Sequence, residues 1–430
     1  MKRVLVITYY WPPAGGAGVQ RWVKFTKYLR EFGWEPVIYT PSNPQPGPEN
    51  RELEKELPEG IEVIKTKICE PYAVYRKLTG GASTQITELS AATGKVSWKK
   101  RISLFIRGNF FIPDPRCGWV RPSVTFLKKY LKEHPVDAVV TTGPPHSMHL
   151  IGLALKRRTG IPWVADFRDP WTKMFYFKDL RMLPWAERRH ERLEQQVIDE
   201  ASAVISVASQ VRDDFRNRSK GRVELITNGY DSSDFDGPEP DRDTAHWRVV
   251  QTGNIGADGN PRLLWKILGE MAADIPEVRE KLQIRLCGKL GAGVAESLEA
   301  AKVMQNTVLR GYVSHDETVL EQRSADLLLL PLREGVEGGK IVPGKTFEYL
   351  AARRRILGIG DAYGSAAQIL SQTGSGKMLA WDDEEGMRSE LMASWKAFCE
   401  GSYLIENTDI EQYSRRALSG RLAQLLDSLV

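Results

Sequence analysis

Two apolar segments of the sequence each run directly into a glycine-rich turn, and this pattern restricts the fold more than any other feature. Arg3–Tyr9 is followed by Trp11–Arg21, which contains three glycines, and then by an amphipathic helix to Phe32. Arg248–Thr252 is followed by Gly253-Asn254-Ile255-Gly256. A strand, a glycine turn and a helix in this order predict a Rossmann-like α/β unit. Glycine at such a turn also lets the backbone approach a ligand closely.

Alternating strand and helix patterns continue after each of these units, so the chain contains two α/β series. They are separated by Asp234–His246, which is rich in proline and acid and has no periodicity. A chain of 430 residues is also too long for one ordinary core. We predict two Rossmann-like domains. Their expected boundaries are 1–236 with an insertion near 72–114, a linker at 237–246, a second domain at 247–404 and a C-terminal helix at 405–430 that packs back on the first domain.

Polar residues follow several expected strands of the first series, where a binding site would form. His146 follows the strand Ala138–Thr142, and Asp166, Arg168 and Asp169 follow the strand Pro162–Ala165. These residues are candidates for substrate binding or proton transfer. A purely structural role for Asp166, paired with Arg168, is an equally good interpretation of the same residues.

The second series contains a strand, a glycine-rich loop and a helix start at Ala325–Arg355. The first helical turn, with Gly344, Lys345 and Thr346, offers backbone N–H groups and a positive dipole end that suit phosphate. Glu348 lies one turn further, where a carboxylate can accept hydrogen bonds from sugar hydroxyls. A nucleotide carries both a phosphate and sugar hydroxyls, so it is a candidate ligand. The alternative is an ordinary βα unit with a solvated glutamate. No acid ends the strand Glu35–Thr40, so NAD is not the expected ligand.

Charge and cysteine content restrict the partners. The net charge is +5, but 60 basic residues are accompanied by 55 acidic ones, so binding of nucleic acid is not expected. The segment Lys95–Ile112 interleaves cations with aromatic and aliphatic residues, which suits an anionic membrane interface. Its alternative role is an amphipathic helix that covers the first domain. The four cysteines have no metal-ligand spacing and are expected to be reduced thiols of a cytosolic protein.

Several motifs, taken in order, resemble those of the family-4 retaining glycosyltransferases of bacterial surface-polysaccharide pathways, which have the GT-B fold of two Rossmann-like domains facing across a cleft. The resemblance covers nearly the whole chain and is weakest at Tyr72–Asp114. The motifs are Pro13–Gly18, Asn228–Asp231 with Phe235, Thr252–Gly256, Ala325–Leu327 and Pro343–Leu350.

The resemblance implies transfer of a sugar from a nucleotide diphosphate donor to a glycan or lipid-linked acceptor, with retention of the anomeric configuration. Glu348 would hold the ribose, and Gly344, Lys345 and Thr346 would face the diphosphate. No cofactor or metal is implied, because basic side chains and a helix dipole stabilise the leaving group. The other implied donor-site residues are Gly15, Gly16, Gly18, Gly253, Asn254 and Lys289.

One departure from the family concerns the donor sugar. The family has two glutamates eight positions apart, but Lys340 stands eight residues before Glu348. Lys340 is therefore a candidate to neutralise phosphate instead. Two other functions are compatible with the same motifs: a GT-B nucleotide-sugar 2-epimerase, and a non-catalytic nucleotide-sugar-binding protein. The expected location is the cytoplasm, with peripheral contact to the inner face of the membrane.

Overall fold

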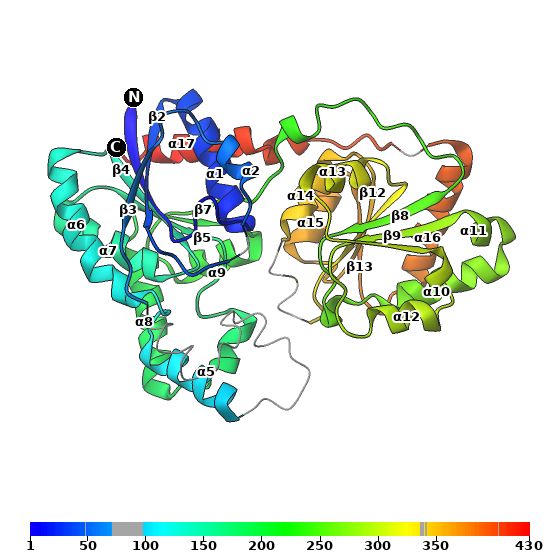
Figure 1. Cartoon of the computed structure of the whole chain (residues 1–430), viewed down its shortest axis with the longest axis horizontal. Coiled ribbons are helices and arrows are strands. Elements are labelled where there is room, and N and C mark those ends of the chain that lie inside the picture. Colours follow the sequence, from blue (N-terminus) through cyan, green and yellow to red (C-terminus); the bar gives the residue numbers. More distant parts are fainter. Residues whose placement is uncertain (48, 71–97, 336–338, 340–341, 403) are drawn as a thin grey trace. The chain divides into compact units, whose positions relative to one another are not determined.

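The computed structural model describes residues 1–47, 49–70, 98–335, 339, 342–402 and 404–430 (Figure 1). Lys340 and the first three residues of Lys95–Ile112 lie outside the described residues. The chain forms two compact units, Met1–Thr227 with Leu418–Val430, and Asn228–Ala417. Each unit is built on its own parallel sheet.

The first unit has a seven-stranded sheet in the order β3-β2-β1-β4-β5-β6-β7, and all of its described strand pairs are parallel. The strands are β1 (Lys2–Ile7), β2 (Trp34–Pro41), β3 (Glu62–Thr66), β4 (Ala138–Gly143), β5 (Trp163–Phe167), β6 (Ala203–Ser206) and β7 (Val223–Leu225). The helices are α1 (Ala17–Leu29), α2 (Glu52–Lys55), α5 (Trp98–Phe110), α6 (Val120–Glu133), α7 (Ser147–Thr159), α8 (Pro184–Glu200) and α9 (Ser209–Arg218), with a 3₁₀ segment η3 (Phe175–Leu180).

The second unit has a six-stranded parallel sheet in the order β10-β9-β8-β11-β12-β13. The strands are β8 (Trp247–Thr252), β9 (Leu282–Cys287), β10 (Thr307–Gly311), β11 (Leu327–Pro331), β12 (Arg355–Ile359) and β13 (Gly376–Leu379). The helices are α10 (Arg262–Asp274), α11 (Pro276–Lys281), α12 (Val294–Ala300), α13 (His315–Arg323), α14 (Gly344–Ala351), α15 (Ser365–Thr373) and α16 (Glu384–Glu400), and α17 (Arg415–Asp427) ends the chain.

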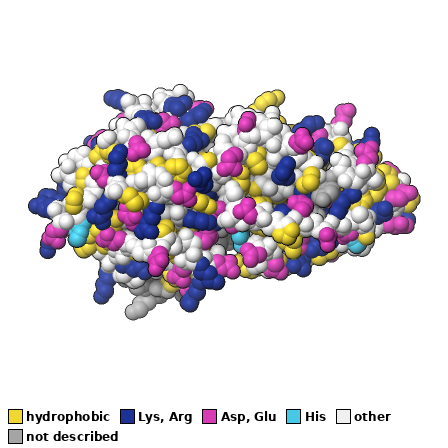
Figure 2. All heavy atoms as spheres, turned by 90° about the horizontal axis from the view of Figure 1, so that it is seen from above, with side chains coloured by type: hydrophobic (Ala, Val, Ile, Leu, Met, Phe, Trp, Pro, Cys, Tyr) yellow, Lys and Arg dark blue, Asp and Glu magenta, His cyan; other side chains and the backbone are white. Residues whose placement is uncertain are grey.

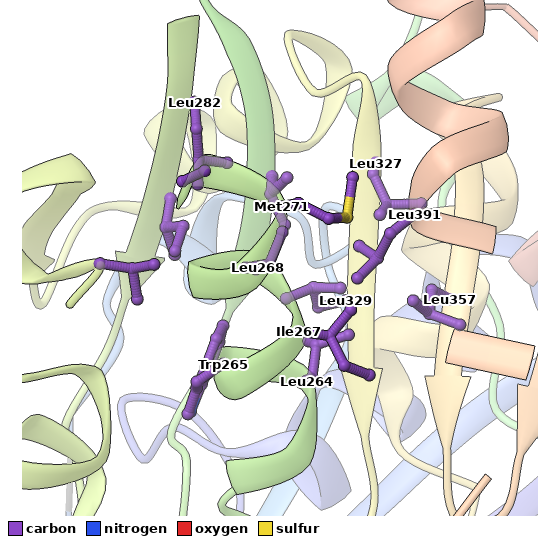
Figure 3. Close-up of a cluster of buried hydrophobic side chains, with 14 of the residues drawn as sticks. Leu264, Trp265, Ile267, Leu268, Met271, Leu282, Leu327, Leu329, Leu357 and Leu391 are labelled. Carbon is purple, nitrogen blue, oxygen red and sulfur yellow. The ribbon is translucent and has the colours of Figure 1, made fainter. Parts of the chain in front are cut away.

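Apolar side chains of sheet and helix interlock in the core of each unit. In the second unit, Leu264, Leu268 and Met271 of α10 pack on Leu327 and Leu329 of β11 (Figure 3). The four leucines at 327–330 of β11 are all fully buried, so both faces of this strand are covered, which explains its continuous leucine run.

The C-terminal helix packs on the first sheet, as predicted. Leu418, Leu422 and Leu426 of α17 belong to the same buried cluster as Val4 and Trp22. The predicted fold class, two Rossmann-like sheets with a returning C-terminal helix, is confirmed. On the face shown in Figure 2, basic and acidic side chains are interspersed without a broad patch of either sign.

The strand order fixes where each site can form. β1 lies next to β4, and β8 lies next to β11, so the chain direction across the sheet reverses at these two positions. Loops that leave the carboxyl ends of such neighbouring strands diverge, and the gap between them holds ligands in open α/β sheets.

Candidate active site

A pocket of about 440 Å³ lies at the carboxyl ends of β1, β4 and β5 in the first unit. It is formed by the glycine loop after β1, the loop Pro144–His146 after β4 and Arg168-Asp169 after β5. The residues that the sequence predicted and that line this pocket are Gly15, Gly16, Gly18, His146, Arg168 and Asp169.

Gly18 has a steric reason to be glycine. A Cβ atom at this position would lie 1.2 Å from Nη1 of Arg168. The guanidinium group therefore rests directly on the first turn of α1, and another of its nitrogens donates to the carbonyl oxygen of Pro144. Among the described residues, no carboxylate forms an ion pair with Arg168, so its charge is available to a ligand.

His146 is buried but has no hydrogen-bond partner on either ring nitrogen in the described part of the chain. Its ring stacks on Trp171, with 5.0 Å between centroids and 3° between planes. Burial lowers the pKa of His146 well below its ordinary value, and His149 and Arg168 lower it further. The imidazole is therefore neutral near pH 7, with both nitrogens available to a ligand hydroxyl.

Asp169 is partly buried, and burial raises its pKa although the neighbouring Arg168 acts in the opposite direction. A carboxyl group with a raised pKa takes up a proton more readily than a solvated one. The pocket therefore combines a neutral imidazole, His146, with a carboxyl group whose pKa is raised by burial.

Asp166 lies below the pocket and does not line it. Its side chain and that of Arg21 are fully buried and form an ion pair with an Nη2–Oδ1 distance of 2.9 Å. Trp22 Nε1 and Thr142 Oγ1 also donate to Oδ2 of Asp166, at 2.8 and 3.0 Å. The hydrogen-bonded partner is Arg21, whereas the structural interpretation of the sequence paired Asp166 with Arg168. Arg21 was missed because it lies on α1, far from Asp166 in sequence.

The structure adds pocket residues that the sequence did not single out. These are Arg107, Asp114, Arg116, Trp171 and His190. Trp171 Nε1 donates to Nδ1 of His190 at 3.1 Å. Asp114 accepts hydrogen bonds from the backbone N–H and the hydroxyl of Ser147, both at 2.8 Å, and so caps α7 next to His146. Three of these residues lie in or next to the insertion, where no regular pattern indicated their position.

The second unit joins the predicted nucleotide-site residues at the carboxyl ends of β8 and β11. Lys345, in the first turn of α14, donates from Nζ to the carbonyl oxygen of Thr252 at 3.0 Å. Burial lowers the pKa of Lys345 to about 8, against the opposite effect of Glu348. The ammonium group is thus held where charge is poorly solvated, which favours binding of an anion.

Glu348 is held by a side chain that the sequence did not reveal. Nε2 of Gln322, on α13, donates to Oε2 of Glu348 at 2.9 Å and to Oγ1 of Thr252 at 3.1 Å. The N–H of Thr252 donates to the hydroxyl of Tyr349 at 2.9 Å. Oε2 of Glu348 is fixed by this network, and the carboxylate keeps acceptor capacity for sugar hydroxyls.

The second glycine turn lies beside this cluster. Gly253 has a φ of 85°, and a Cβ there would approach Nζ of Lys345 to 3.9 Å. Oδ1 of Asn254 accepts from the N–H of Lys289 at 2.9 Å, while the Lys289 side chain is exposed. Thr346 is buried in the described structure with no partner on its hydroxyl, and Gly344 begins α14.

The described residues contain no group of three or more His, Cys, Asp and Glu side chains placed to hold a metal ion. Independence of the activity from metal stays a prediction. None of the helices in the described ranges is both long and apolar enough to cross a bilayer.

Comparison with known proteins agrees with this arrangement. A family model described as a glycosyl transferase 4-like domain matches residues 15–229, half of the chain. No protein of curated function matches the sequence.

Solved structures show the same fold. Sucrose-phosphate synthase from Thermosynechococcus elongatus has a TM-score of 0.61 at 13% identity, covering 100% of this chain and 99% of that one. WaaG, a glycosyltransferase involved in lipopolysaccharide biosynthesis, has a TM-score of 0.57 at 14% identity, covering 98% and 99%. A putative UDP-N-acetylglucosamine 2-epimerase from Listeria monocytogenes has a TM-score of 0.55 at 9% identity, covering 99% of this chain and 96% of that one.

The fold is therefore that of the GT-B glycosyltransferases. The chain belongs to the glycosyl transferase 4-like family, as the motif resemblance implied. The structural likenesses share less than a seventh of their residues with this chain and establish the fold alone.

Proposed function

We propose that the protein transfers a hexose from a nucleotide diphosphate sugar to a glycan or lipid-linked acceptor, with retention, in cell-surface polysaccharide biosynthesis. The observation that carries the proposal is the cluster at the start of α14. There, a carboxylate held by Gln322 lies one helical turn from Lys345 and the N–H groups of the first turn. Such a cluster matches the ribose and the diphosphate of a nucleotide sugar. Retention rests on the family resemblance.

In this mechanism, the second unit binds the donor and stabilises its leaving group. Glu348 accepts hydrogen bonds from the ribose hydroxyls. The α14 N–H groups and Lys345 face the diphosphate, and the poorly solvated ammonium stabilises the negative charge that develops as the bond to the sugar breaks. Gly253, Asn254 and Lys289 line the same strand ends. We propose that these groups make a metal ion unnecessary, so activity should persist in excess EDTA.

The first unit binds the acceptor in its pocket. The unpartnered ring nitrogens of His146 and the carboxyl group of Asp169 would receive and orient sugar hydroxyls, and Arg168 would offset negative charge on either substrate. Asp166 would act through Arg21 on the shape of the glycine loop, not on the substrate. We place the reaction in the cytoplasm at the inner face of the membrane, with Lys95–Ile112 as the contact segment.

The test is a thermal-shift screen of the full chain against nucleoside-diphosphate sugars. A donor present at about 100 times its Kd should stabilise the native protein by roughly 2.7 kcal/mol. Glu348→Ala should abolish most of that shift with little change in the unliganded melting temperature, since Glu348 is partly exposed.

Glu385→Ala is the matched control, because Glu385 is an exposed glutamate of the same unit on α16. An unchanged donor shift in Glu348→Ala would remove the basis for this nucleotide site. With the donor identified, incubation without acceptor separates the enzyme classes: a 2-epimerase changes the donor sugar at C2, and a transferase does not.

A further inference from the structure

Helix α5 exposes a row of four large apolar side chains. Trp98, Ile102, Ile106 and Phe110 are spaced by four residues and therefore share one face. Their exposed fractions are 67%, 49%, 39% and 65%. Leu104 and Gly108 lie on the opposite face of the helix and are buried. The apolar row on α5 is therefore additional to the face that holds the helix on the unit.

The beginning of α8 extends this apolar row into a wider surface. Leu183 and Trp185 are also exposed, and the rings of Trp185 and Phe110 lie 6.5 Å apart. Figure 1 shows α5 next to α8 in the first unit. We refer to Trp98, Ile102, Ile106, Phe110, Leu183 and Trp185 together as the two-helix surface.

Two residues fix α5 against the turn that precedes α8. Oδ1 of Asn109 accepts the N–H of Leu183 at 2.7 Å, and its Nδ2 donates to the carbonyl oxygen of Arg181 at 3.3 Å. Gly108 permits the close approach, because a Cβ there would lie 2.7 Å from the carbonyl oxygen of Leu180. The two-helix surface is thus held as one body.

The two sequence segments that form this surface both carry a net positive charge. The sequence from Trp98 to Phe110 contains four basic residues and no acidic one. The sequence 181–192 contains four arginines and two glutamates. Exposed aromatic residues amid a positive excess match the interface of a bilayer that contains anionic lipid, where tryptophan rings and cations are favoured. Because tryptophan is also enriched at protein–protein interfaces, the positive excess on both segments is the feature that favours an anionic bilayer.

Helix α5 and the 3₁₀ segment η3 also form part of the pocket wall in the first unit. Arg107 of α5 and Phe177 and Leu180 of η3 line the pocket that contains His146 and Arg168. A membrane in contact with the two-helix surface would therefore lie close to the side of the pocket built by α5 and η3.

We propose that the two-helix surface docks the protein on anionic bilayers, and that the pocket beside it receives the head group of an acceptor embedded in the same bilayer. The second part rests on the proposed function, and the first part does not. The acceptor class is an amphiphile with a sugar-bearing head group. The proposed contact segment Lys95–Ile112 is thereby extended by Leu183, which precedes α8, and by Trp185 of α8.

The docking test uses the full chain and vesicles, without any nucleotide sugar. Sedimentation with vesicles of 30% phosphatidylglycerol in phosphatidylcholine should recover the protein, and pure phosphatidylcholine should recover several-fold less. The variant Ile106→Gln/Phe110→Ser should bind at least tenfold more weakly, because it removes two interfacial side chains. Neutralising Lys99, Lys100 and Arg101 should also weaken binding to the anionic vesicles.

The matched control is Leu320→Gln/Tyr363→Ser, which removes exposed apolar residues of the second unit. Equal vesicle binding by the wild type and the Ile106/Phe110 variant would overturn the docking surface. So would a wild type that ignores vesicles but forms dimers that this variant separates, since the surface would then join two copies of the chain.

The acceptor test uses membranes and the radiolabelled donor identified by the screen. The label should enter the fraction extracted by chloroform and methanol, and Ile106→Gln/Phe110→Ser should reduce that incorporation about tenfold while leaving the donor-induced thermal shift intact. Label that enters only water-soluble glycan would overturn the lipid-embedded acceptor. A failed donor screen would refute the proposed function and leave the vesicle result valid.

Discussion

Replacing Asp166 by asparagine should strongly destabilise the first unit, because a buried guanidinium would lose its counter-charge. The side chains of Asp166 and Arg21 are fully buried, and Arg21 also donates to the carbonyl oxygens of Ile226 and Thr227. Asparagine keeps the shape, so no cavity forms and the change isolates the charge. Breaking one side of such a pair costs about 3–5 kcal/mol. That is a large part of a total stability of about 5–15 kcal/mol.

Hydrogen exchange of the intact chain measures this effect unit by unit. Peptides from β1, β4 and β5 should exchange roughly a hundredfold faster or more in Asp166→Asn, because every 1.4 kcal/mol is about a factor of ten. Peptides from β8 and β11 belong to the other unit and serve as an internal control. Global melting is a poorer measure, since a chain with two units need not unfold in one step.

Asp169→Asn is the matched variant. In contrast to Asp166→Asn, it should leave the stability nearly unchanged and reduce the activity. Burial raises the pKa of Asp169, so the folded state already disfavours its charge, and neutralisation should change stability by less than about 1 kcal/mol. Transfer activity should fall instead, because Asp169 lines the pocket. The reasoning is refuted if Asp166→Asn exchanges like the wild type, or if both variants lose the same stability.

Three further outcomes are expected. Gly18→Ala should displace Arg168 and reduce kcat/KM about a hundredfold or more with little loss of stability. Gly221→Ala, in the same unit but outside the pocket, where a Cβ meets only ordinary van der Waals contacts, should be near wild type; similar kinetics for both would contradict the assigned contact. Donor affinity should fall as pH rises through about 8, where Lys345 loses its proton, and calorimetry of Lys345→Met should show a weaker, flatter profile. Although burial alone would raise the pKa of Asp166, Arg21 and Trp22 hold it below its ordinary value, so the stability it contributes should be present above about pH 4 and lost as pH falls further, as measured by exchange or denaturant titration.

Local pattern was enough to predict the strand ends and several site residues. An apolar run followed by a glycine turn defines a strand and its carboxyl end, and parallel strands bring these ends to one edge of a sheet. His146, Arg168 and Asp169 therefore fell into one pocket, and Lys345 and Glu348 onto one helix, as the sequence indicated.

The partners of these residues were not predictable in the same way. Arg21 and Asp166 are 145 residues apart, and Gln322 and Glu348 are 26 apart on different helices. Nothing in the spacing of either pair indicates a contact. The assignment of Asp166 shows the consequence, because the neighbouring Arg168 was the obvious partner in sequence while the packed sheet supplied Arg21.

The sequence by itself determined the two α/β series, the glycine turns and the family, since these follow from short-range periodicity and from motifs within a few residues. Only the tertiary structure decided which polar groups are buried together, which therefore have shifted pKa values, and which apolar residues stay exposed. The physical reason is that burial and electrostatic environment depend on the whole set of neighbours, which long-range packing brings together. Trp98, Ile102, Ile106 and Phe110 have the spacing of a core-facing helix, and their exposure on α5 is a property of the fold.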